Sequence, residues 1–380
     1  MVAHMQNKIL TVKYHDMVVG RLALTPDNLM AFEYDAGWLE NGFSISPFKL
    51  PLEKRVFIAN RNPFDGVFGV FNDSLPDSWG QLLVNRELQR RGIAPNSLSV
   101  LDRLAIVGKN GPGALEFEPA AEMISEYKDS ELDDIATQVR KIIEDSTITT
   151  EDKITEELFR IGGSSGGTRP KIFRKIDGAD WIIKFPARTD PIDIGTQEFN
   201  IMESAIKAGL DTPEHRLFNE KYFGVQRFDR KPNGDKVFMI SAAGLLDADH
   251  TQPVVDYSDL LSLTAKLTRN MVEVEKMFRL MVFNIWINNT DDHTKNFAFL
   301  YDNGDWHVSP VFDLTRTPGI WEHTTSVNGK GIDITGADML AVAHRVGISD
   351  KRAGDIMLDV RSVFEQPNNP VRNSILSGKN

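Results

Sequence analysis

The sequence predicts an α+β chain with two lobes, the first rich in β-strands and the second mainly helical. Two observations support this fold class. Alternating polar and apolar residues with many β-branched side chains indicate strands within residues 8–24 and 180–186. Apolar residues at helical spacing run through residues 257–268 and 274–287. We therefore expect sheets in the first half of the chain and packed helices in the second.

Length, composition and charge limit the classes of protein that fit. A chain of 380 residues exceeds one compact core and suggests two or three units. No run approaches the roughly 18 to 20 apolar residues of a membrane span, and no basic and apolar leader is visible, so we expect a soluble, cytoplasmic protein without a membrane partner. The absence of cysteine excludes disulfides and thiolate metal sites. A net charge of −11 disfavours broad contact of this chain with nucleic-acid phosphates.

Four segments follow one another along the chain. We expect an N-terminal α/β subdomain at 1–122, a helical connector at 123–157, a small lobe at 158–230 and a helical C-terminal lobe at 231–380. The first segment contains the strands of residues 8–24 and a helix within 72–91, with Asn72 as a cap candidate and Gly92 at its end. The glycine-rich stretch 108–114 lacks the Lys-Ser/Thr ending of a phosphate loop, which favours a turn.

A second glycine-rich stretch begins the small lobe. The apolar run 158–161, read as a strand, leads into residues 162–167, where four glycines flank two serines. Glycine amides and serine hydroxyls can approach phosphates closely, although a flexible linker has a similar composition. The candidate nucleotide-binding residues of this loop are Ser164, Ser165, Gly166 and Gly167.

Lys184 lies inside the apolar strand that follows this loop. A lysine in such a frame needs a partner or a ligand, and Glu198 in the predicted helix 197–206 can pair with it. The order of glycine loop, strand lysine and helix glutamate is that of the small lobe of protein kinases. The later strand end at residues 224–230 would lie between the lobes, where its backbone could read an adenine edge.

The most informative stretch is 288–296 together with 309–314. Asp291 precedes Asn296 by five positions, and Asp313 follows Asn296 by seventeen. A kinase needs one carboxylate to orient and deprotonate a hydroxyl, and oxygen ligands to hold magnesium. The intervening residues 297–308 read as strand, turn and strand. Such a hairpin would bring both metal ligands to one edge, although Asp313 could instead cap a helix.

Three neighbours of Asp291 have less specific roles. We expect Asp292 to be a solvated or capping carboxylate. One imidazole beside hard oxygen ligands favours His293 as a brace of the loop rather than a metal ligand. Lys295 either neutralises the transferred phosphate or is simply exposed, and both readings stay open.

Several motifs in one order resemble the HipA family of serine/threonine kinase toxins from bacterial toxin–antitoxin pairs. The resemblance covers most of the chain, and it implies a protein-kinase-like bilobal fold with an N-terminal α/β subdomain. The motifs that carry it are residues 75–80, 113–117, the Ser/Gly loop up to Lys171, 183–186, 227–230, 291–296 and 310–313.

By this resemblance, Asp291 is the catalytic base, and Asn296 and Asp313 are the Mg²⁺ ligands. Lys184 resembles the residue that binds the phosphates of ATP. The adenine-contacting strand matches Gln226, Arg227 and Phe228, with Asp229 directed to the ribose. In the family a serine of the phosphate loop is autophosphorylated, which ejects the loop and inactivates the kinase. Counting back from Lys171 places Ser164 at that position, with Ser165 as a competitor; residues 167–171 depart from the family's common Gly-x-Gln-x-Lys.

The resemblance also implies partners. These are a small helix-turn-helix antitoxin (HipB-like), operator DNA bound only through it, and a protein substrate such as an aminoacyl-tRNA synthetase. Two alternatives stay open: a small-molecule or lipid kinase with the same site, and a catalytically silent kinase that anchors a partner. The acceptor of the phosphate from ATP distinguishes them: a protein, a small hydroxyl compound, or none despite nucleotide binding.

Overall fold

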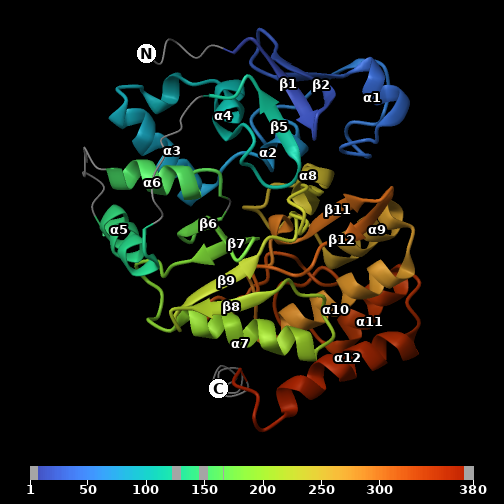
Figure 1. The fold of residues 1–380 in the computed structure, drawn as a ribbon. Helices are drawn as coiled ribbons and strands as arrows, with labels where there is room; N and C mark the ends of the chain where they lie inside the picture. Colours follow the sequence, from blue (N-terminus) through green and yellow to red (C-terminus); the bar gives the residue numbers. More distant parts are fainter. Residues whose placement is uncertain (1–6, 122–129, 145–152, 166, 372–380) are drawn as a thin grey trace. The chain divides into compact units, whose positions relative to one another are not determined.

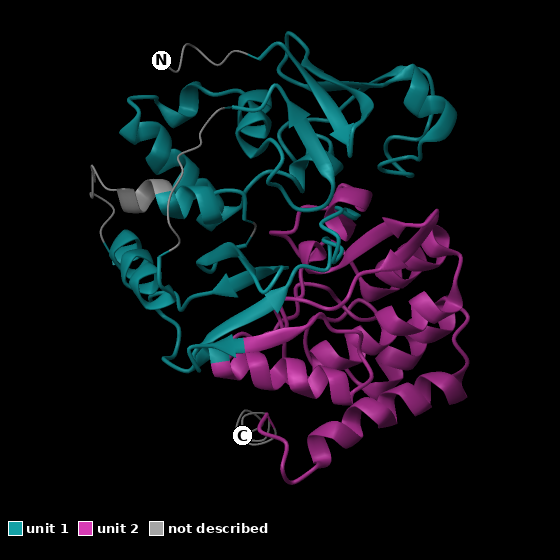
Figure 2. Cartoon of the chain, viewed as in Figure 1, with its two compact units in different colours: residues 1–195, 217–239 teal, residues 196–216, 240–380 magenta. Residues whose placement is uncertain are grey.

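The chain divides into two compact units, which Figure 2 shows in teal and magenta. The computed structural model describes residues 7–121, 130–144, 153–165 and 167–371. The predicted loop residue Gly166 and parts of the predicted connector lie outside these residues. Unit 1 comprises residues 1–195 and 217–239, and unit 2 comprises residues 196–216 and 240–380.

The N-terminal part of unit 1 is an antiparallel sheet of order β4-β3-β2-β1-β5 (Figure 1). The predicted strands of residues 8–24 are confirmed as β1 and β2. Leu10, Val12 and Leu22 alternate with more exposed residues and are fully buried, so one face of the sheet forms a core. The strands are β1 (Ile9–Tyr14), β2 (Met17–Leu24), β3 (Met30–Tyr34), β4 (Val56–Ile58) and β5 (Leu115–Glu118); the helices are α1 (Ala36–Asn41), α2 (Gly69–Asn72) and α4 (Val100–Val107).

The helix predicted within residues 72–91 is interrupted near its start. Helix α2 ends at Asn72, and α3 (Ser78–Arg90) begins only after its N-cap residue Asp77. Pro76 explains the break, because the residue before a proline is pushed out of the helical region. Asn72 is therefore not the cap of the long helix, whereas Gly92 lies directly beyond its end with a positive φ of 73°.

The second sheet has the order β6-β7-β9-β8. Helices α3, α5 and α6 contribute Trp79, Ile135 and Leu158 to one buried cluster with Ile172 and Ile183 of this sheet. Residues 158–161 were expected to be a strand, which is wrong: they belong to a helix, whose apolar face reaches this cluster. The elements are α5 (Leu132–Glu144), α6 (Lys153–Gly162), β6 (Lys171–Ile176), β7 (Ala179–Lys184), β8 (His215–Phe218) and β9 (Tyr222–Gln226).

Unit 2 is mainly helical, as predicted. The apolar residues of α9 and α10 form its core, and both helices lie where the helical spacing placed them. A small sheet of order β10-β11-β12 accompanies them. Two elements have their first two residues in unit 1, namely α7 (Ile194–Lys207) and β10 (Phe238–Ser241). The others are α8 (Ala242–Leu246), α9 (Tyr257–Thr268), α10 (Met271–Ile287), β11 (Ala298–Asp302), β12 (Asp305–Val308), α11 (Gly336–Arg345) and α12 (Asp350–Glu365).

The structure divides into two units, whereas four segments were predicted from the sequence. The boundaries of those four segments stay a prediction. Among the described helices, none combines the length and the apolar composition that crossing a membrane requires.

Candidate active site

The loop with the predicted catalytic base directly follows α10. Asn288 ends the helix in the left-handed conformation, with a φ of 55°. Residues 294–296 then form a single 3₁₀ turn, in which the backbone N–H of Asn296 donates to the carbonyl of His293 at 2.8 Å. The buried helix on one side and β11 on the other hold this loop at both ends.

Asp291 and Asn296 are joined directly. The side-chain amide Nδ2 of Asn296 donates to the backbone carbonyl of Asp291 at 2.7 Å. The oxygen Oδ1 is therefore the end of the amide that suits a cation. The Asp291 side chain is 60% exposed, with His293 Nε2 at 3.9 Å from its Oδ1. His293 thus lies beside the carboxylate, where a brace was predicted.

The hairpin predicted at residues 297–308 is confirmed as β11 and β12. Asp302 pairs with Asp305 across a two-residue turn, Asn303-Gly304, in which both residues have positive φ. At the open end, the N–H of Ser309 donates to the carbonyl of Ala298 at 2.9 Å. Asn296 precedes β11 and Asp313 follows β12, so both belong to the chain segments at the open end of one hairpin.

Asp313 has a strained backbone. Its φ of 51° lies in the left-handed region, which costs energy for a residue with a side chain. A residue in this conformation does not begin a helix, and the described residues after it, up to Thr335, contain none. The alternative role of Asp313 as a helix cap is therefore wrong.

Asp292 differs from the expectation. Its carboxylate was predicted to be solvated or to cap a helix, yet it is fully buried. Tyr257 Oη and His323 Nδ1 each contact its Oδ2 at 2.9 Å, and the N–H of Thr325 donates to Oδ1 at 3.2 Å. Three donors satisfy the buried charge, so Asp292 belongs to the interior of unit 2.

In unit 1, the Ser/Gly loop packs on the start of α3. The N–H of Gly167 donates to Asp77 Oδ2 at 3.1 Å. A Cβ on Gly80 would lie 2.5 Å from the carbonyl oxygen of Ser165, so only glycine allows this approach. The motif of residues 75–80 therefore supports the loop, a role that the sequence did not reveal.

The two serines of this loop have different surroundings. Ser164 is partly exposed, and its hydroxyl donates to the carbonyl of Asn110 at 2.8 Å. Ser165 is fully buried, and its hydroxyl donates to the carbonyl of Gly162 at 2.6 Å. Of the two, Ser164 is the hydroxyl that another molecule can reach.

Lys184 lies at the end of β7, directly opposite Lys171 of β6. Both side chains are less than 10% exposed. A Cβ on Gly167 would lie 2.7 Å from Lys171 Nζ, so the loop passes close to the end of the Lys171 side chain. Glu198 is buried in unit 2, and its pairing with Lys184 stays a prediction.

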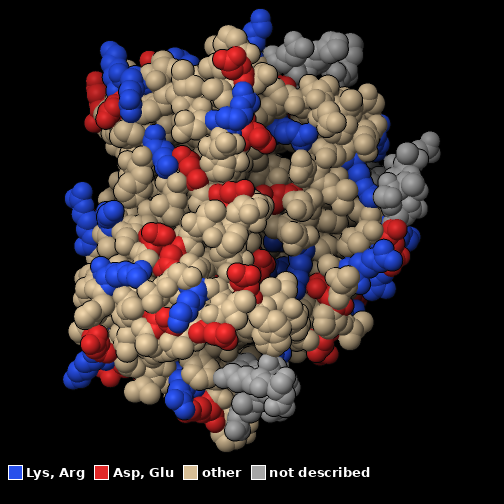
Figure 3. Space-filling model, turned by 180° about the vertical axis from the view of Figure 1, so that it is seen from behind, with Lys and Arg blue, Asp and Glu red and all other residues tan. Residues whose placement is uncertain are grey.

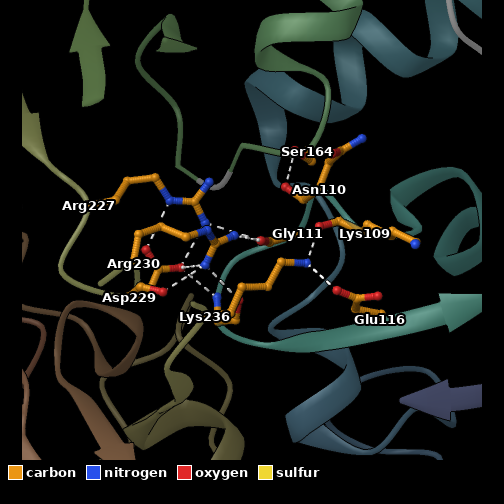
Figure 4. A network of polar contacts seen from close by, with 10 residues as sticks. Lys109, Asn110, Gly111, Glu116, Ser164, Arg227, Asp229, Arg230 and Lys236 are labelled. Atoms are coloured by element: carbon orange, nitrogen blue, oxygen red, sulfur yellow. Dashed lines mark hydrogen bonds and ion pairs between the residues drawn. The ribbon is translucent and has the colours of Figure 1, made fainter. Parts of the chain in front are cut away.

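The strand end at Gln226 leads into a buried ionic cluster, shown in Figure 4. Asp229 accepts four hydrogen bonds: two from Arg227 at 2.9 and 2.7 Å, one from Arg230 at 2.9 Å and one from the N–H of Gly113 at 2.7 Å. Both oxygens of this carboxylate accept hydrogen bonds within the protein. A contact to a ribose stays a prediction for Asp229, and a ribose hydroxyl would compete with the donors of this cluster.

The same cluster includes the turn at residues 108–114. Both Arg227 and Arg230 donate to the carbonyl of Gly111, at 3.2 and 3.0 Å, while Asn110 accepts from Ser164 (Figure 4). Burial and repulsion from Arg227 lower the pKa of Arg230 to about 10, so it stays cationic at neutral pH. The turn therefore joins the Ser/Gly loop to the end of β9, and no sequence pattern predicted this contact.

Two family models match this chain. The HipA N-terminal domain matches residues 10–118, and the HipA-like C-terminal domain matches residues 163–366, more than half of the chain. The chain belongs to the HipA family. The second match contains the Ser/Gly loop, Lys184 and the residues from Asp291 to Asp313.

Relatives of this HipA-family protein cover most of its length. Y4mE of Sinorhizobium fredii, which is named as a kinase, is 27% identical over 341 residues, 82% of this chain and 77% of the relative. The serine/threonine-protein kinase toxin HipA of Shewanella oneidensis is 23% identical over 346 residues, 81% of this chain and 75% of that one.

A solved structure shows the same fold. It is a complex of HipA, HipB and operator DNA from Shewanella oneidensis, with a TM-score of 0.67 at 18% identity. The match covers 97% of this chain and 94% of the other. The predicted α+β, kinase-like fold of the HipA type is thereby confirmed.

Charges on the face drawn in Figure 3 are mixed. Basic side chains of the described residues alternate there with acidic ones, so this face carries no continuous basic patch. This agrees with the net charge of −11. Neither feature favours extended contact with nucleic-acid phosphates by this chain.

Proposed function

We propose that this HipA-family protein is an ATP- and Mg²⁺-dependent serine/threonine-protein kinase and the toxin of a toxin–antitoxin pair. One observation carries the proposal. The β11–β12 hairpin brings the segments that carry Asn296 and Asp313 to its open end. The side-chain amide of Asn296 is also hydrogen-bonded to the backbone of Asp291. Phosphoryl transfer to a hydroxyl requires a carboxylate for the hydroxyl and oxygen ligands for the metal, which Asp291, Asn296 and Asp313 can supply.

Each residue then has a role in the reaction. The substrate hydroxyl oxygen forms a bond to the γ-phosphorus while the bond from that phosphorus to ADP breaks, and the hydroxyl proton passes to Asp291. When bound, ATP supplies the phosphoryl group and Mg²⁺ neutralises charge on its phosphates. Lys184, Lys295 and the loop residues Ser164 to Gly167 would bind phosphate oxygens. The strand end Gln226 to Phe228 would hold the adenine.

The donor set of unit 2 fits Mg²⁺. Asn296 and Asp313 offer an amide and a carboxylate oxygen, which this hard cation prefers. Among the described residues, no group of three or more His, Asp or Glu forms a metal cage. Mg²⁺ does not need one, because it keeps waters and uses phosphate oxygens alongside few protein ligands.

Ser164 is our candidate for autophosphorylation. It is the accessible serine of the loop, whereas Ser165 is fully buried. Phosphorylation would remove the hydroxyl hydrogen that bonds Asn110 and would add roughly −1.5 to −2 charge beside the phosphates of a nucleotide. The loop would leave the site. Ser164→Ala should stay unmodified after incubation with ATP in mass spectrometry, while Ser165→Ala should still gain one phosphate.

The partner of this chain would be a small helix-turn-helix antitoxin similar to HipB. The Shewanella HipA structure contains HipB and operator DNA, and a chain of net charge −11 suits DNA contact delegated to a partner. We further propose a protein substrate of the translation apparatus, such as an aminoacyl-tRNA synthetase, and a cytoplasmic location.

Phosphoryl transfer tests the proposed activity. The protein should transfer label from γ-labelled ATP to a protein in a lysate, and only with Mg²⁺. Asp291→Asn should lower kcat about 10²- to 10⁴-fold, the usual contribution of a general base. Asp305→Asn, at an exposed position of the β12 turn, is the matched control and should keep full activity.

The other outcomes separate the alternatives. Label in a small hydroxyl compound and in no protein would favour the small-molecule or lipid kinase. Nucleotide binding without any turnover by the unphosphorylated protein would favour a silent kinase that anchors a partner.

A further inference from the structure

The segment of residues 317–325 is bonded along the predicted catalytic loop on both sides of Asp291. Before Asp291, the N–H of Thr290 donates to Thr317 Oγ1 at 2.9 Å. The carbonyl of Thr290 accepts from the N–H of Thr324 at 3.2 Å and from its hydroxyl at 2.9 Å. After Asp291, the backbone carbonyl of Asp292 accepts from the hydroxyl of Thr325.

One further contact of this segment joins two buried side chains, His323 and Asp292. His323 is 5% exposed and Asp292 is fully buried, with Nδ1 of the imidazole 2.9 Å from Oδ2 of the carboxylate. An ionised carboxylate only accepts hydrogen bonds, so the proton in this contact lies on Nδ1. Charge-assisted hydrogen bonds of this kind are about twice as strong as neutral ones.

A second chain of bonds reaches Asp292 from the helices. Tyr257 of α9 donates its hydroxyl to the same Oδ2 at 2.9 Å and accepts from Asn284 Nδ2 of α10 at 3.0 Å. Burial and the negative charge of Asp292 raise the pKa of Tyr257, so the phenol keeps the hydrogen that it donates. Asp292 is therefore fixed both to the helical core and to the segment that follows Asp313.

We propose that His323 and Asp292 are positioning residues that hold Asp291 in its direction for phosphoryl transfer. This inference rests on the proposed kinase activity. The Asp291 side chain is 60% exposed, so packing around this side chain contributes little to its orientation. The adjacent buried aspartate can, because consecutive side chains on an anchored loop point in fixed, different directions. A displacement of about 1 Å at a reacting group can cost about a hundredfold in rate.

His323 is the residue to change, because it lies outside the predicted catalytic machinery. His323→Leu removes the donor at Nδ1, and we expect kcat to fall at least about tenfold with the KM for ATP unchanged within about twofold. His323→Asn should recover most of the rate, since its Nδ2 can occupy the position of Nδ1. His344→Leu is the matched control, an exposed histidine of α11, and should leave kcat unchanged.

Hydrogen–deuterium exchange of the peptide 288–297 supplies a measurement that needs no activity. We expect faster exchange of this peptide in His323→Leu, with α12 unchanged, and recovery in His323→Asn. Wild-type kcat in folded His323→Leu, or faster exchange throughout the protein, would overturn the positioning role. If the wild type transfers no phosphate, the kinase proposal fails, and unchanged exchange of this peptide would separately overturn the anchoring.

Discussion

Three aspartates of this protein differ in burial, and their burial decides what a substitution changes. Asp291 is 60% exposed, whereas Asp292 and Asp229 are buried. An exposed carboxylate can meet a substrate at little desolvation cost, but a buried one must be satisfied by donors within the protein. We therefore expect substitution of Asp291 to lower the kinase activity, and substitution of Asp229 mainly to lower the free energy of unfolding.

Replacing Asp229 with asparagine should destabilise the protein strongly. Arg227 and Arg230 would keep their buried charges without the carboxylate that compensates them. Breaking a buried ion pair in this way costs about 3 to 5 kcal/mol. Urea unfolding at neutral pH should show this loss for Asp229→Asn and almost none for Asp305→Asn. A stability equal to that of the wild type would mean that the cluster contributes no net stability.

The pH dependence of this difference has a definite sign. Burial alone would raise the pKa of Asp229. Attraction to the charges of Arg227 and Arg230, with hydrogen bonds from Arg227 and Gly113, outweighs burial and lowers the pKa. The folded state then binds fewer protons than the unfolded state, whose aspartate titrates at about 4. The stabilisation is present above about pH 4 and is lost as the pH falls through the lowered pKa. The difference in unfolding free energy between the wild type and Asp229→Asn should therefore become smaller as the pH is lowered below about 4.

Candidate site residues could be named from the sequence, but the surroundings of the buried aspartates could not, and both outcomes have physical reasons. Asp291, Asn296 and Asp313 were predicted because the chemistry fixes their residue types and their spacing along the chain. The burial of Asp292 was not predictable, because its partners Tyr257 and His323 lie 35 and 31 positions away. Arg227 and Arg230 are sequence neighbours of Asp229, but Gly113 lies 116 positions away and reaches it only after folding.

Among the elements, the hairpin and the long helices were predicted well because their signals are local. An Asn-Gly turn between alternating residues specifies β11 and β12, and caps with apolar spacing specify α9 and α10. The apolar run at 158–161 was misread because a short apolar run fits a buried helix as well as a strand. Its assignment to α6 depends on packing against the second sheet.

Two helical glycines should respond oppositely to alanine. Gly354 in α12 has open space around its Cα, so Gly354→Ala should raise the unfolding free energy by roughly 0.5 to 1 kcal/mol. Gly80 in α3 lies against the Ser/Gly loop, and Gly80→Ala should lower it by about 1 to 3 kcal/mol through overpacking. Chemical denaturation measures both, and Gly80→Ala should also weaken ATP binding. Stabilisation by both substitutions would show that the loop does not rest on α3.

On the scale of the whole molecule, the order of the sheet strands is not the order of the sequence. Strand β9 pairs with β7 in unit 1, although helix α7, which lies between them in the sequence, belongs mostly to unit 2. No sequence pattern predicts that α7 belongs mostly to the other unit. Apolar periodicity shows that an element has a buried face, but it does not show which core that face joins.

Fragments of the chain test this arrangement. A fragment of residues 1–195 lacks β9 and leaves β7 as an open edge, which favours aggregation. A fragment of residues 1–239 contains every strand of that sheet. We expect cooperative thermal unfolding and a defined size in gel filtration for 1–239, and aggregation for 1–195, with the full chain as reference. A well-folded 1–195 would contradict the role of β9 in completing unit 1.

The hydrogen bond from Gly113 to Asp229 spans 116 positions and has a consequence for synthesis on the ribosome. The first sheet can form early in translation, but the ionic cluster that secures it to β9 must wait for Asp229. Asn296 and Asp313 emerge later still. A nascent polypeptide that is released before Asp313 should thus transfer no phosphate, because Asn296 and Asp313 are synthesised only after every residue of unit 1.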